Sequence, residues 1–454
     1  MVASDAPIDL RLLPERSSVD ARGRLSIAGV DLVDLAETHG TPLYVYDEQE
    51  LRDRCRAYRD AFGTDDGAAN VSYASKAFLC TAMAQLVADE GLELDVASGG
   101  EAHVALRGGF PGPRMVFHGN NKSDDELRLA LSLPAGRVVI DGFDELDRVE
   151  SLVAGGLAPP RVLLRITPGI DAHTHEHIAT GGADSKFGFT LDSGIADEAA
   201  LRAATSSRVE LAGFHCHLGS QLFDLDVYEA AADELAALAA RLRVATGRPI
   251  AEINLGGGLG VAYTAAEAGG VPSIAVFAHV LQAAHAAACA RHGVLDPVPR
   301  LTVEAGRSIA ARAGLTLYQV GTVKEVPGGD PYVAVDGGMS DNPRPITYGA
   351  RYEAFLPGRA AEARPLRATV AGKHCEQGDL LVRGAQLPAG VSVGDVLATP
   401  VTGAYAHSMA SNYNLLQRPA VVFVRDGEAR VVVRRETLDD LVPRDVAARG
   451  KTEV

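Results

Sequence analysis

The sequence is poor in cysteine and has no cysteine pair at a metal-binding or redox spacing. Its five cysteines, at positions 55, 80, 216, 289 and 375, form no Cys-x-x-Cys motif, and their odd number favours reduced thiols. No Lys/Arg run interrupts a net charge of −16, which argues against a nucleic-acid partner. Met1–Asp20 has no apolar signal core, and no uninterrupted apolar run approaches a membrane span. We therefore expect a cytoplasmic protein without a membrane partner.

The chain is too long for one small core. It has 454 residues, of which 47% are hydrophobic and 22% charged, an ordinary globular composition. A chain of this length usually forms one large domain and a second one.

Eight apolar, β-prone runs alternate with helical patterns in the first two thirds of the chain. A helix is expected over 47–62, with Asp47 and Glu50 as a capping box. Further helices are expected over Ser123–Leu131, capped by Ser123 and Glu126, and over Val227–Ala245, closed by Gly247. The eight expected strands are Val71–Ser75, Leu92–Ala97, Met115–His118, Val138–Asp141, Val162–Thr167, Leu211–His217, Glu252–Leu255 and Leu301–Glu304.

This alternation predicts a (β/α)8 barrel over 46–310. An open doubly wound sheet is the alternative, but the Gly-x-Gly-x-x-Gly fingerprint it would carry after the first strand is missing. Over 311–454, strand-like runs follow one another without long helices, which predicts a mostly antiparallel all-β domain with a terminal helical segment. Its last two strands pair across the Asp426-Gly427 turn, and strands in 1–45 are expected to join it.

Lys76 ends the first barrel strand, Val71-Ser-Tyr-Ala-Ser-Lys76. An ammonium at the inner end of a buried strand loses hydration, so its pKa is expected to fall. Such an amine can form a Schiff base with a carbonyl. The alternative for this segment alone is a salt-bridged lysine at a strand end.

The active site of such a barrel lies at the carboxyl ends of its strands. Strand seven ends in Gly256-Gly257-Gly258 and strand eight in Glu304-Ala-Gly306-Arg307, in the loops that commonly hold a phosphate. Pyridoxal phosphate needs a Schiff-base lysine, a phosphate cradle and a group facing its pyridine nitrogen. A carboxylate such as Glu304 there favours decarboxylation. Alternatively, the glycines form a tight loop and Glu304 pairs with an arginine such as Arg165.

Histidines give a second set of candidates. His215 and His217 are expected on one strand face, where His217 could stack on a bound ring or both could bind a metal. The run His173-Thr-His175-Glu-His177 is also metal-like, but no further ligand set completes it, so no metal is predicted.

Two polar segments of the β domain are candidate binding loops. Lys373-His-Cys375-Glu376-Gln-Gly-Asp379 places a thiol among ionisable groups, where it could transfer protons or be inert. The segments 339–348 and 403–408 are turn-rich and polar, so they either bind a ligand or are ordinary turns.

Taken together, these motifs closely resemble those of the diaminopimelate decarboxylases, fold-type III enzymes that use pyridoxal phosphate. The resemblance runs from about Pro42 to Pro443. It is carried by Tyr73-Ala-Ser-Lys76, His215-Cys-His-Leu-Gly-Ser-Gln221, Gly256-Gly-Gly258, Glu304-Ala-Gly-Arg307, Asn342-Pro-Arg344 with Tyr348, Cys375-Glu-Gln-Gly-Asp379 and Gly403-Ala-Tyr405.

The resemblance implies a role for each motif residue. Lys76 would hold the cofactor as a Schiff base, His217 would stack on its ring and Glu304 would face the pyridine nitrogen. Cys375 would return a proton to the substrate carbon. The phosphate region would be held by Ser220, Gly256, Gly257, Gly258, Gly306 and Arg307, with Tyr405 also on the cofactor. The substrate would be read by Arg307, Arg344, Tyr348, Glu376 and Tyr405.

The implied reaction converts meso-2,6-diaminopimelate at its D-centre into L-lysine and carbon dioxide, the final step of lysine biosynthesis. Cys375 and Glu376 would reach the site from a partner subunit, so a homodimer would share its active sites. Ala305 and Gln377 stand where the family often has Pro and Ser, which puts in doubt only the hydrogen bonding around Cys375.

Two other functions remain as alternatives. A decarboxylase of another basic amino acid or polyamine precursor would not need Arg344 for a distal carboxylate. A non-catalytic pyridoxal-phosphate-binding protein would not need Cys375 as a proton donor.

Overall fold

The computed structural model describes residues 7–65, 68–133, 135–170, 185–192 and 194–446. The chain forms two compact units. The first comprises residues 1–50, 263–266 and 311–454, and the second comprises 51–262 and 267–310. The run His173–His177 lies outside the described residues, so the metal alternative at that place stays untested.

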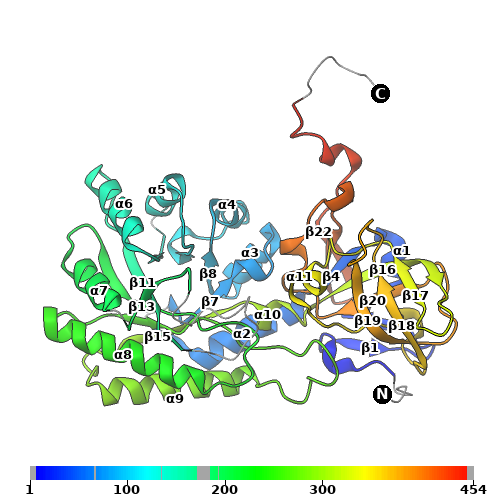
Figure 1. Ribbon diagram of the computed structural model, residues 1–454, viewed down its shortest axis with the longest axis horizontal. Coiled ribbons are helices and arrows are strands. Elements are labelled where there is room, and N and C mark those ends of the chain that lie inside the picture. Colours follow the sequence, from blue (N-terminus) through cyan, green and yellow to red (C-terminus); the bar gives the residue numbers. More distant parts are fainter. Residues whose placement is uncertain (1–6, 66–67, 134, 171–184, 193, 447–454) are drawn as a thin grey trace. The chain divides into compact units, whose positions relative to one another are not determined.

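The second unit is a closed barrel of eight parallel strands (Figure 1). Each strand pairs with the next around the barrel, β10 pairs with β11, and β15 returns to β7. A two-residue strand, β12 (Phe189–Thr190), pairs with the carboxyl end of β11. The barrel strands are β7 (Val71–Ala74), β8 (Glu93–Val96), β9 (Met115–Phe117), β10 (Arg137–Ile140), β11 (Arg161–Thr167), β13 (Glu210–His215), β14 (Glu252–Asn254) and β15 (Arg300–Ala305). The predicted (β/α)8 barrel is confirmed.

A helix follows each barrel strand, and α2 (Glu48–Phe62) precedes the first. The others are α3 (Thr81–Asp89), α4 (Gly99–Arg107), α5 (Asp124–Ser132), α6 (Phe143–Ala154), α7 (Ile195–Thr205), α8 (Val227–Thr246), α9 (Ile274–Arg291) and α10 (Arg307–Ala310). Ser123 and Glu126 form the predicted capping box of α5. Gly247 ends α8 with φ of 72°, a conformation that glycine adopts without strain.

By length and composition alone, α9 could cross a membrane. Its packing is that of a barrel helix, because the Phe277 ring lies 5.4 Å from the Tyr228 ring and 6.4 Å from the Tyr58 ring, centroid to centroid. Apolar residues of α9 therefore pack against other helices of the second unit.

The barrel strands are apolar on both faces because the interior and the surrounding helices both cover them. Val116, Val139, Leu163 and Ala212 form one buried cluster from four strands. At the amino ends of the strands, Arg137 forms ion pairs with Glu93 and Glu252, and all three side chains are buried. Polar groups thus fill this end of the barrel, and each buried charge has an opposite one beside it.

The first unit contains an eight-stranded sheet in which most neighbours are antiparallel. The parallel pairs are β17 with β18 and β4 with β21. Its strands are β4 (Leu43–Asp47), β16 (Gly314–Lys324), β17 (Tyr332–Val335), β18 (Leu366–Ala371), β19 (Leu380–Leu387), β20 (Val396–Pro400), β21 (Ala420–Arg425) and β22 (Glu428–Val433). The predicted mostly antiparallel domain is confirmed, and Asp426 and Gly427 form its predicted hairpin turn with positive φ.

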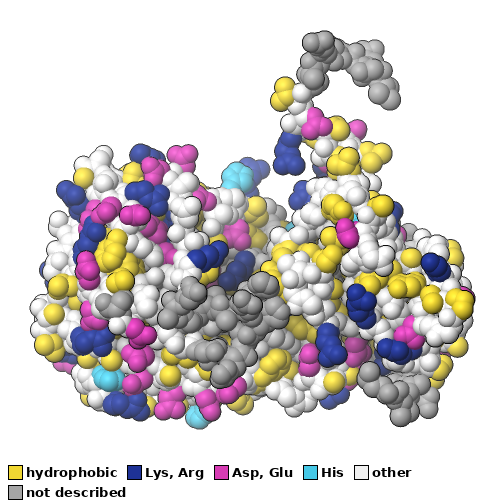
Figure 2. Space-filling view, viewed as in Figure 1, with side chains coloured by type: hydrophobic (Ala, Val, Ile, Leu, Met, Phe, Trp, Pro, Cys, Tyr) yellow, Lys and Arg dark blue, Asp and Glu magenta, His cyan; other side chains and the backbone are white. Residues whose placement is uncertain are grey.

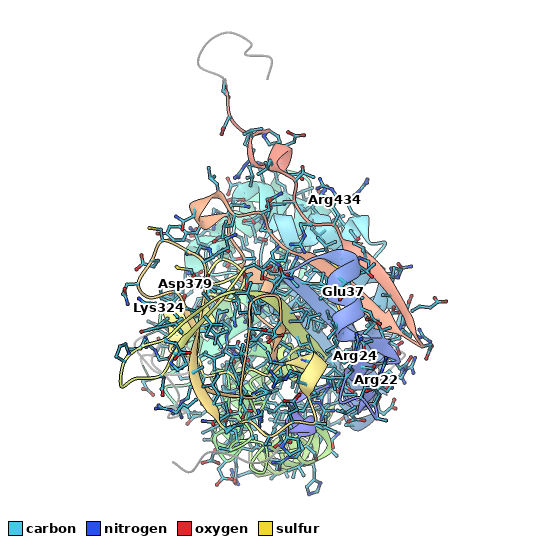
Figure 3. All side chains as sticks on the ribbon, turned by 90° about the vertical axis from the view of Figure 1, so that its right-hand side faces the viewer. Arg22, Arg24, Glu37, Lys324, Asp379 and Arg434 are labelled. Atoms are coloured by element: carbon cyan, nitrogen blue, oxygen red, sulfur yellow. The ribbon has the colours of Figure 1, made fainter. Side chains whose placement is uncertain are left out.

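The N-terminal segment adds a second small sheet to this unit. Strands β1 (Ser17–Val19), β2 (Leu25–Ile27) and β3 (Val30–Asp31) are antiparallel, and α1 (Leu32–His39) follows. Arg24, labelled in Figure 3, binds the carboxylates of Asp31 and Asp34 at 2.5 Å and so joins β2 to the start of α1. Leu25 and Leu32 lie in one buried cluster with residues of β4, β16 and β21, such as Leu43.

Several short elements complete the described chain. The strands β5 (Thr64–Asp65) and β6 (Ala68–Ala69) pair antiparallel. The helical elements are α11 (Arg344–Tyr348) and the 3-10 turns at Leu10–Leu12, Ser75–Ala77, Gly112–Arg114, Pro357–Arg359, His407–Met409, Tyr413–Leu415 and Leu438–Leu441. The predicted terminal helical segment is thus represented, among the described residues, by the single turn at Leu438–Leu441.

On the face shown in Figure 2, basic side chains are scattered among acidic and neutral ones. That face carries no continuous basic surface of the kind that binds phosphate backbones.

Candidate functional site

Lys76 lies beyond the end of its strand. β7 stops at Ala74, and Lys76 stands in the 3-10 turn Ser75–Ala77 with its side chain exposed. The prediction of a buried ammonium is therefore wrong, because the strand ends at Ala74, one residue before the expected Ser75, and the following turn leaves the Lys76 side chain exposed. Burial dominates the pKa shifts of Asp95 and His217, and the charge of Lys76 contributes a smaller lowering effect to each, so the Lys76 ammonium lies within electrostatic reach of both.

Glu304 lies near the carboxyl end of β15, and two histidines contact its Oε1 atom. The Nε2 atom of His215 is 3.0 Å away and that of His118 is 3.3 Å away. Arg165, the predicted alternative partner, instead has its Nε 3.8 Å from Oδ1 of Asp141. No ion pair between Glu304 and Arg165 occurs among the described residues.

The pKa values of Glu304 and its neighbour Asp95 shift in opposite directions. Burial and the neighbouring Glu304 raise the pKa of Asp95 well above its usual value. Burial also acts to raise the pKa of Glu304, but His215 and His118 outweigh it and hold that pKa well below the usual value. The low pKa of Glu304 keeps this carboxylate ionised, whereas the shift of Asp95 favours its protonated form.

His217 follows β13 by two residues, so it lies in the loop and not on the strand face that we predicted. Its Nδ1 atom accepts a hydrogen bond from the backbone N–H of Gly257 at 3.3 Å. Partial burial, with the charge of Lys76 in addition, lowers the pKa of His217 well below its usual value. The ring of His217 is thus a neutral imidazole held at one edge by the loop after β14.

The three glycines after β14 allow three loops to approach closely. A Cβ atom on Gly257 would lie 1.9 Å from the carbonyl oxygen of Glu304, and one on Gly256 would lie 2.5 Å from that of Cys216. Gly256 also has φ of +69°, which a side chain would strain. Gly258 has φ of +129°. The predicted tight loop is therefore present, and its backbone stands beside Glu304 and His217.

Ser220 and Arg307 meet in the adjacent loops. Nη2 of the buried Arg307 donates to Oγ of Ser220 at 2.9 Å. The Gln221 side-chain amide donates to the carbonyl of Val261 at 2.5 Å and accepts from its N–H at 3.1 Å, which fastens the loop after β13 to the loop after β14. Gly306 packs closely too, since its Cβ would lie 3.1 Å from that of Ala74.

These residues of the second unit fit pyridoxal phosphate. A buried carboxylate oxygen, Glu304 Oε1, has no regular hydrogen bond among the described residues. Glycine loops that exclude side chains lie beside a serine and a buried arginine, which is the donor set of a phosphate cradle. A neutral imidazole and an exposed amine complete the group.

Arg344, in the first unit, is enclosed by tyrosines. It begins α11, is buried, and donates from Nη1 to the hydroxyl of Tyr352 at 2.6 Å. Its guanidinium carbon lies 4.6 Å from the centre of the Tyr263 ring. Among the described residues no carboxylate forms an ion pair with Arg344. A buried guanidinium of this kind is suited to bind an anionic ligand group.

Two further predicted residues, Tyr405 and Tyr348, belong to the same unit as Arg344. Tyr405 influences Arg344 electrostatically and adopts φ of +63°, a strained conformation for a bulky residue. Tyr348 ends α11 one turn after Arg344 and is half-buried.

Cys375 and Glu376 are exposed in a turn that a buried carboxylate organises. Asp379, labelled in Figure 3, accepts hydrogen bonds from the N–H of His374 at 2.9 Å and from the N–H of Met339 at 2.7 Å. The N–H of Cys375 donates to Oδ1 of Asn414 at 3.0 Å. Gln377, one of the two departures from the family pattern, is exposed in the same turn.

The sequence analysis did not single out His118, Asp95, Tyr263 or Tyr352. The first two lie at the carboxyl ends of β9 and β8, so the rule that selected Glu304 and His215 would also have selected them. Tyr263 and Tyr352 had no such signal, because neither follows a barrel strand and Tyr263 reaches Arg344 from about 80 residues earlier in the sequence.

Comparison with known proteins gives consistent matches over nearly the whole chain. Residues 48–311 match the family model described as "Pyridoxal-dependent decarboxylase, pyridoxal binding domain". The chain is 46% identical to the diaminopimelate decarboxylase of Bacillus subtilis, covering 95% of this chain and 97% of that protein. It is also 46% identical to that of Corynebacterium efficiens, covering 93% and 92%.

The solved structures agree. The crystal structure of the diaminopimelate decarboxylase of M. jannaschii in complex with L-lysine matches with a TM-score of 0.86 and 32% identity, covering 96% of this chain and 98% of that one. Such identity over the full length shows family membership. The chain belongs to the diaminopimelate decarboxylases, a family of pyridoxal-dependent decarboxylases.

Proposed function

We propose that this protein is a pyridoxal-phosphate-dependent carboxy-lyase that decarboxylates meso-2,6-diaminopimelate at its D-centre, giving L-lysine and carbon dioxide in the final step of lysine biosynthesis. The observation that carries the reaction type is the ionised Glu304 at the carboxyl end of the barrel, within the same electrostatic cluster as Lys76. A carboxylate facing the pyridine nitrogen keeps it protonated, and the bound cofactor then accepts the electrons that remain when carbon dioxide leaves.

The residues of the second unit would hold the cofactor. Lys76 is the amine that binds it covalently, and His217 offers its flat face to the ring. The phosphate would be bound by Ser220, Gly256, Gly257, Gly258, Gly306 and Arg307. Tyr405 would add a contact from the first unit.

The residues of the first unit would read the substrate and return a proton. Arg344 is buried without a carboxylate partner among the described residues, which supports binding of the distal carboxylate. The rest of the distal end would be bound by Tyr348, Glu376 and Tyr405, together with Arg307 of the second unit. Cys375 would deliver its thiol proton to the substrate α-carbon.

A homodimer with shared active sites is part of this proposal. It is supported by the exposure of Cys375 and Glu376, which leaves both side chains free to reach a second copy of the chain. Mixing Lys76→Ala with Cys375→Ala subunits would test it, because random pairing restores one intact site in each mixed dimer and about a quarter of the activity. If the mixture is no more active than its components, the sites are not shared.

We also propose a cytoplasmic location. All five cysteines are free thiols, as expected in a reducing compartment.

A carbon-dioxide release assay tests the function. The holoprotein is offered meso-diaminopimelate, lysine, ornithine and arginine at equal concentrations. We expect release from meso-diaminopimelate alone, since only this substrate has a second carboxylate for Arg344. Preference for any of the other three would overturn the substrate assignment.

A further inference from the structure

Two histidines, the buried His215 and the half-buried His118, converge on one oxygen of Glu304. His118 follows β9 and His215 ends β13, so they approach β15 from separate parts of the barrel. Their Nε2 atoms lie 3.3 Å and 3.0 Å from Oε1, and their rings meet edge to face with centroids 5.2 Å apart. Both approach the same oxygen, which leaves the second oxygen of the carboxylate for another partner.

This contact is the main compensation for burying the three atoms. Nε2 of His118, Nε2 of His215 and Oε1 of Glu304 are buried, and none of them forms a regular hydrogen bond in the described part of the chain, so the two contacts of 3.3 Å and 3.0 Å are what these atoms have. Burying polar atoms without partners costs free energy, and the mutual contact of these three groups offsets part of that cost.

The neighbouring charges do not replace the histidines. Oδ1 of Asp95 lies 3.5 Å from Nε2 of His118, but burial and Glu304 raise the pKa of Asp95 well above its usual value, which disfavours a negative charge there. Burial lowers the pKa of His118 to about 3, so this ring is neutral near pH 7 and can meet the carboxylate through an Nε2–H but not through a positive charge. Arg165 pairs with Asp141, and the Lys76 side chain is exposed in the turn after β7.

We propose that His118 and His215 are positioning residues that fix the Glu304 carboxylate by its Oε1 atom and so direct its other oxygen at the pyridine nitrogen of the cofactor. This inference rests on the proposed function, since it assigns Glu304 to that nitrogen. Without the two N–H donors the carboxylate can rotate toward other groups, and the ring nitrogen loses the partner that keeps it protonated.

Leucine and glutamine substitutions separate this role from simple packing. His215→Leu and His118→Leu remove the donor at similar volume. His215→Gln and His118→Gln retain an amide N–H near the position of Nε2. His285→Leu is the matched control, because His285 is a buried histidine of the same unit whose ring contacts Cys289 in α9.

The readout is the 15N NMR signal of the pyridine nitrogen in holoprotein reconstituted with ring-labelled pyridoxal phosphate, without substrate. We expect the signal of a protonated nitrogen in the wild type, both Gln variants and the control, and a shift toward the unprotonated signal in each Leu variant. With substrate, kcat should fall by about ten- to a hundredfold in the Leu variants, with KM changed by less than about twofold.

Wild-type ring-nitrogen signals in both Leu variants would overturn the inference. Because the two histidines lie on different strands, a variant that fails to fold leaves the other pair of variants to decide, with circular dichroism as the check. A wild-type protein that releases no carbon dioxide from any substrate refutes the proposed function. The substrate-free NMR signal still tests, independently of turnover, whether His118 and His215 keep the pyridine nitrogen protonated.

Discussion

Nδ1 of His374 lies 2.7 Å from Oδ2 of Asp379, and both side chains are buried next to the exposed Cys375. The same carboxylate binds the backbone of Met339, five residues before Arg344. One buried group thus connects the turn that carries the proposed proton donor with the segment that carries the proposed carboxylate reader.

Asp379→Ala should lower the stability of the first unit and slow turnover while the cofactor stays bound. The substitution leaves two backbone N–H donors buried without an acceptor, at a cost of about 1–3 kcal/mol each. Thermal unfolding and cofactor absorbance measure the two effects separately. Asp439→Asn, at an exposed position of the same unit, should change neither. Wild-type turnover in Asp379→Ala would show that the turn does not need this carboxylate.

Arg344→Met should raise KM for meso-diaminopimelate by roughly ten- to a hundredfold, the effect of losing a hydrogen bond to a charged group. Steady-state kinetics measure this change, and the cofactor absorbance should be unaffected. Arg383→Gln is the control, because Arg383 is an exposed arginine of the same unit. An unchanged KM would remove Arg344 from the substrate site.

Cys375→Ala should keep the cofactor absorbance and slow turnover by about a hundredfold or more, as expected when a general acid is lost. Cys289→Ala should have nearly wild-type turnover, since Cys289 is buried in α9 against His285. Rapid-quench measurement of lysine formation checks both variants. A normal rate in Cys375→Ala would mean that another group returns the proton.

Asp341 should make the stability of the first unit depend on pH. Burial raises the pKa of Asp341 to about 7, although Tyr318 and the N–H of Gly338 oppose this, and the nearby Asp379 and Asp336 add to it. The folded state therefore binds a proton that the unfolded state releases near pH 4, so stability falls as the pH rises from about 4 to about 7. Relative to wild type, Asp341→Asn should gain stability over this range in thermal unfolding at several pH values. A constant difference between the two proteins would contradict the assignment.

The barrel could be predicted because its physical signals are local. Parallel strands buried on both faces give continuous apolar runs such as Val162–Ile166, and the rule of carboxyl ends then selects Glu304 and His215. The capping box at Ser123 and Glu126 and the turn at Asp426-Gly427 are likewise set by neighbouring residues.

Other features depend on contacts between distant residues. The exposure of Lys76 follows from the outward turn at Ser75, which strand alternation does not reveal. The enclosure of Arg344 by Tyr263 and Tyr352 depends on residues about 80 and 8 positions away in the sequence, and no spacing rule connects the first of them to Arg344. The position of His118 at the carboxyl end of a barrel strand marks it as a site candidate in the sequence, but its contact with Glu304 depends on the three-dimensional fold.

The most direct test of the central claim is product analysis with wild type and Lys76→Ala. Each protein is incubated with pyridoxal phosphate and meso-diaminopimelate, and carbon dioxide and the enantiomers of lysine are quantified. The wild type should form L-lysine and carbon dioxide in equal amounts, whereas Lys76→Ala should form neither and should lack the absorbance of the covalently held cofactor. Turnover retained by Lys76→Ala, or a product other than L-lysine from the wild type, would contradict the account.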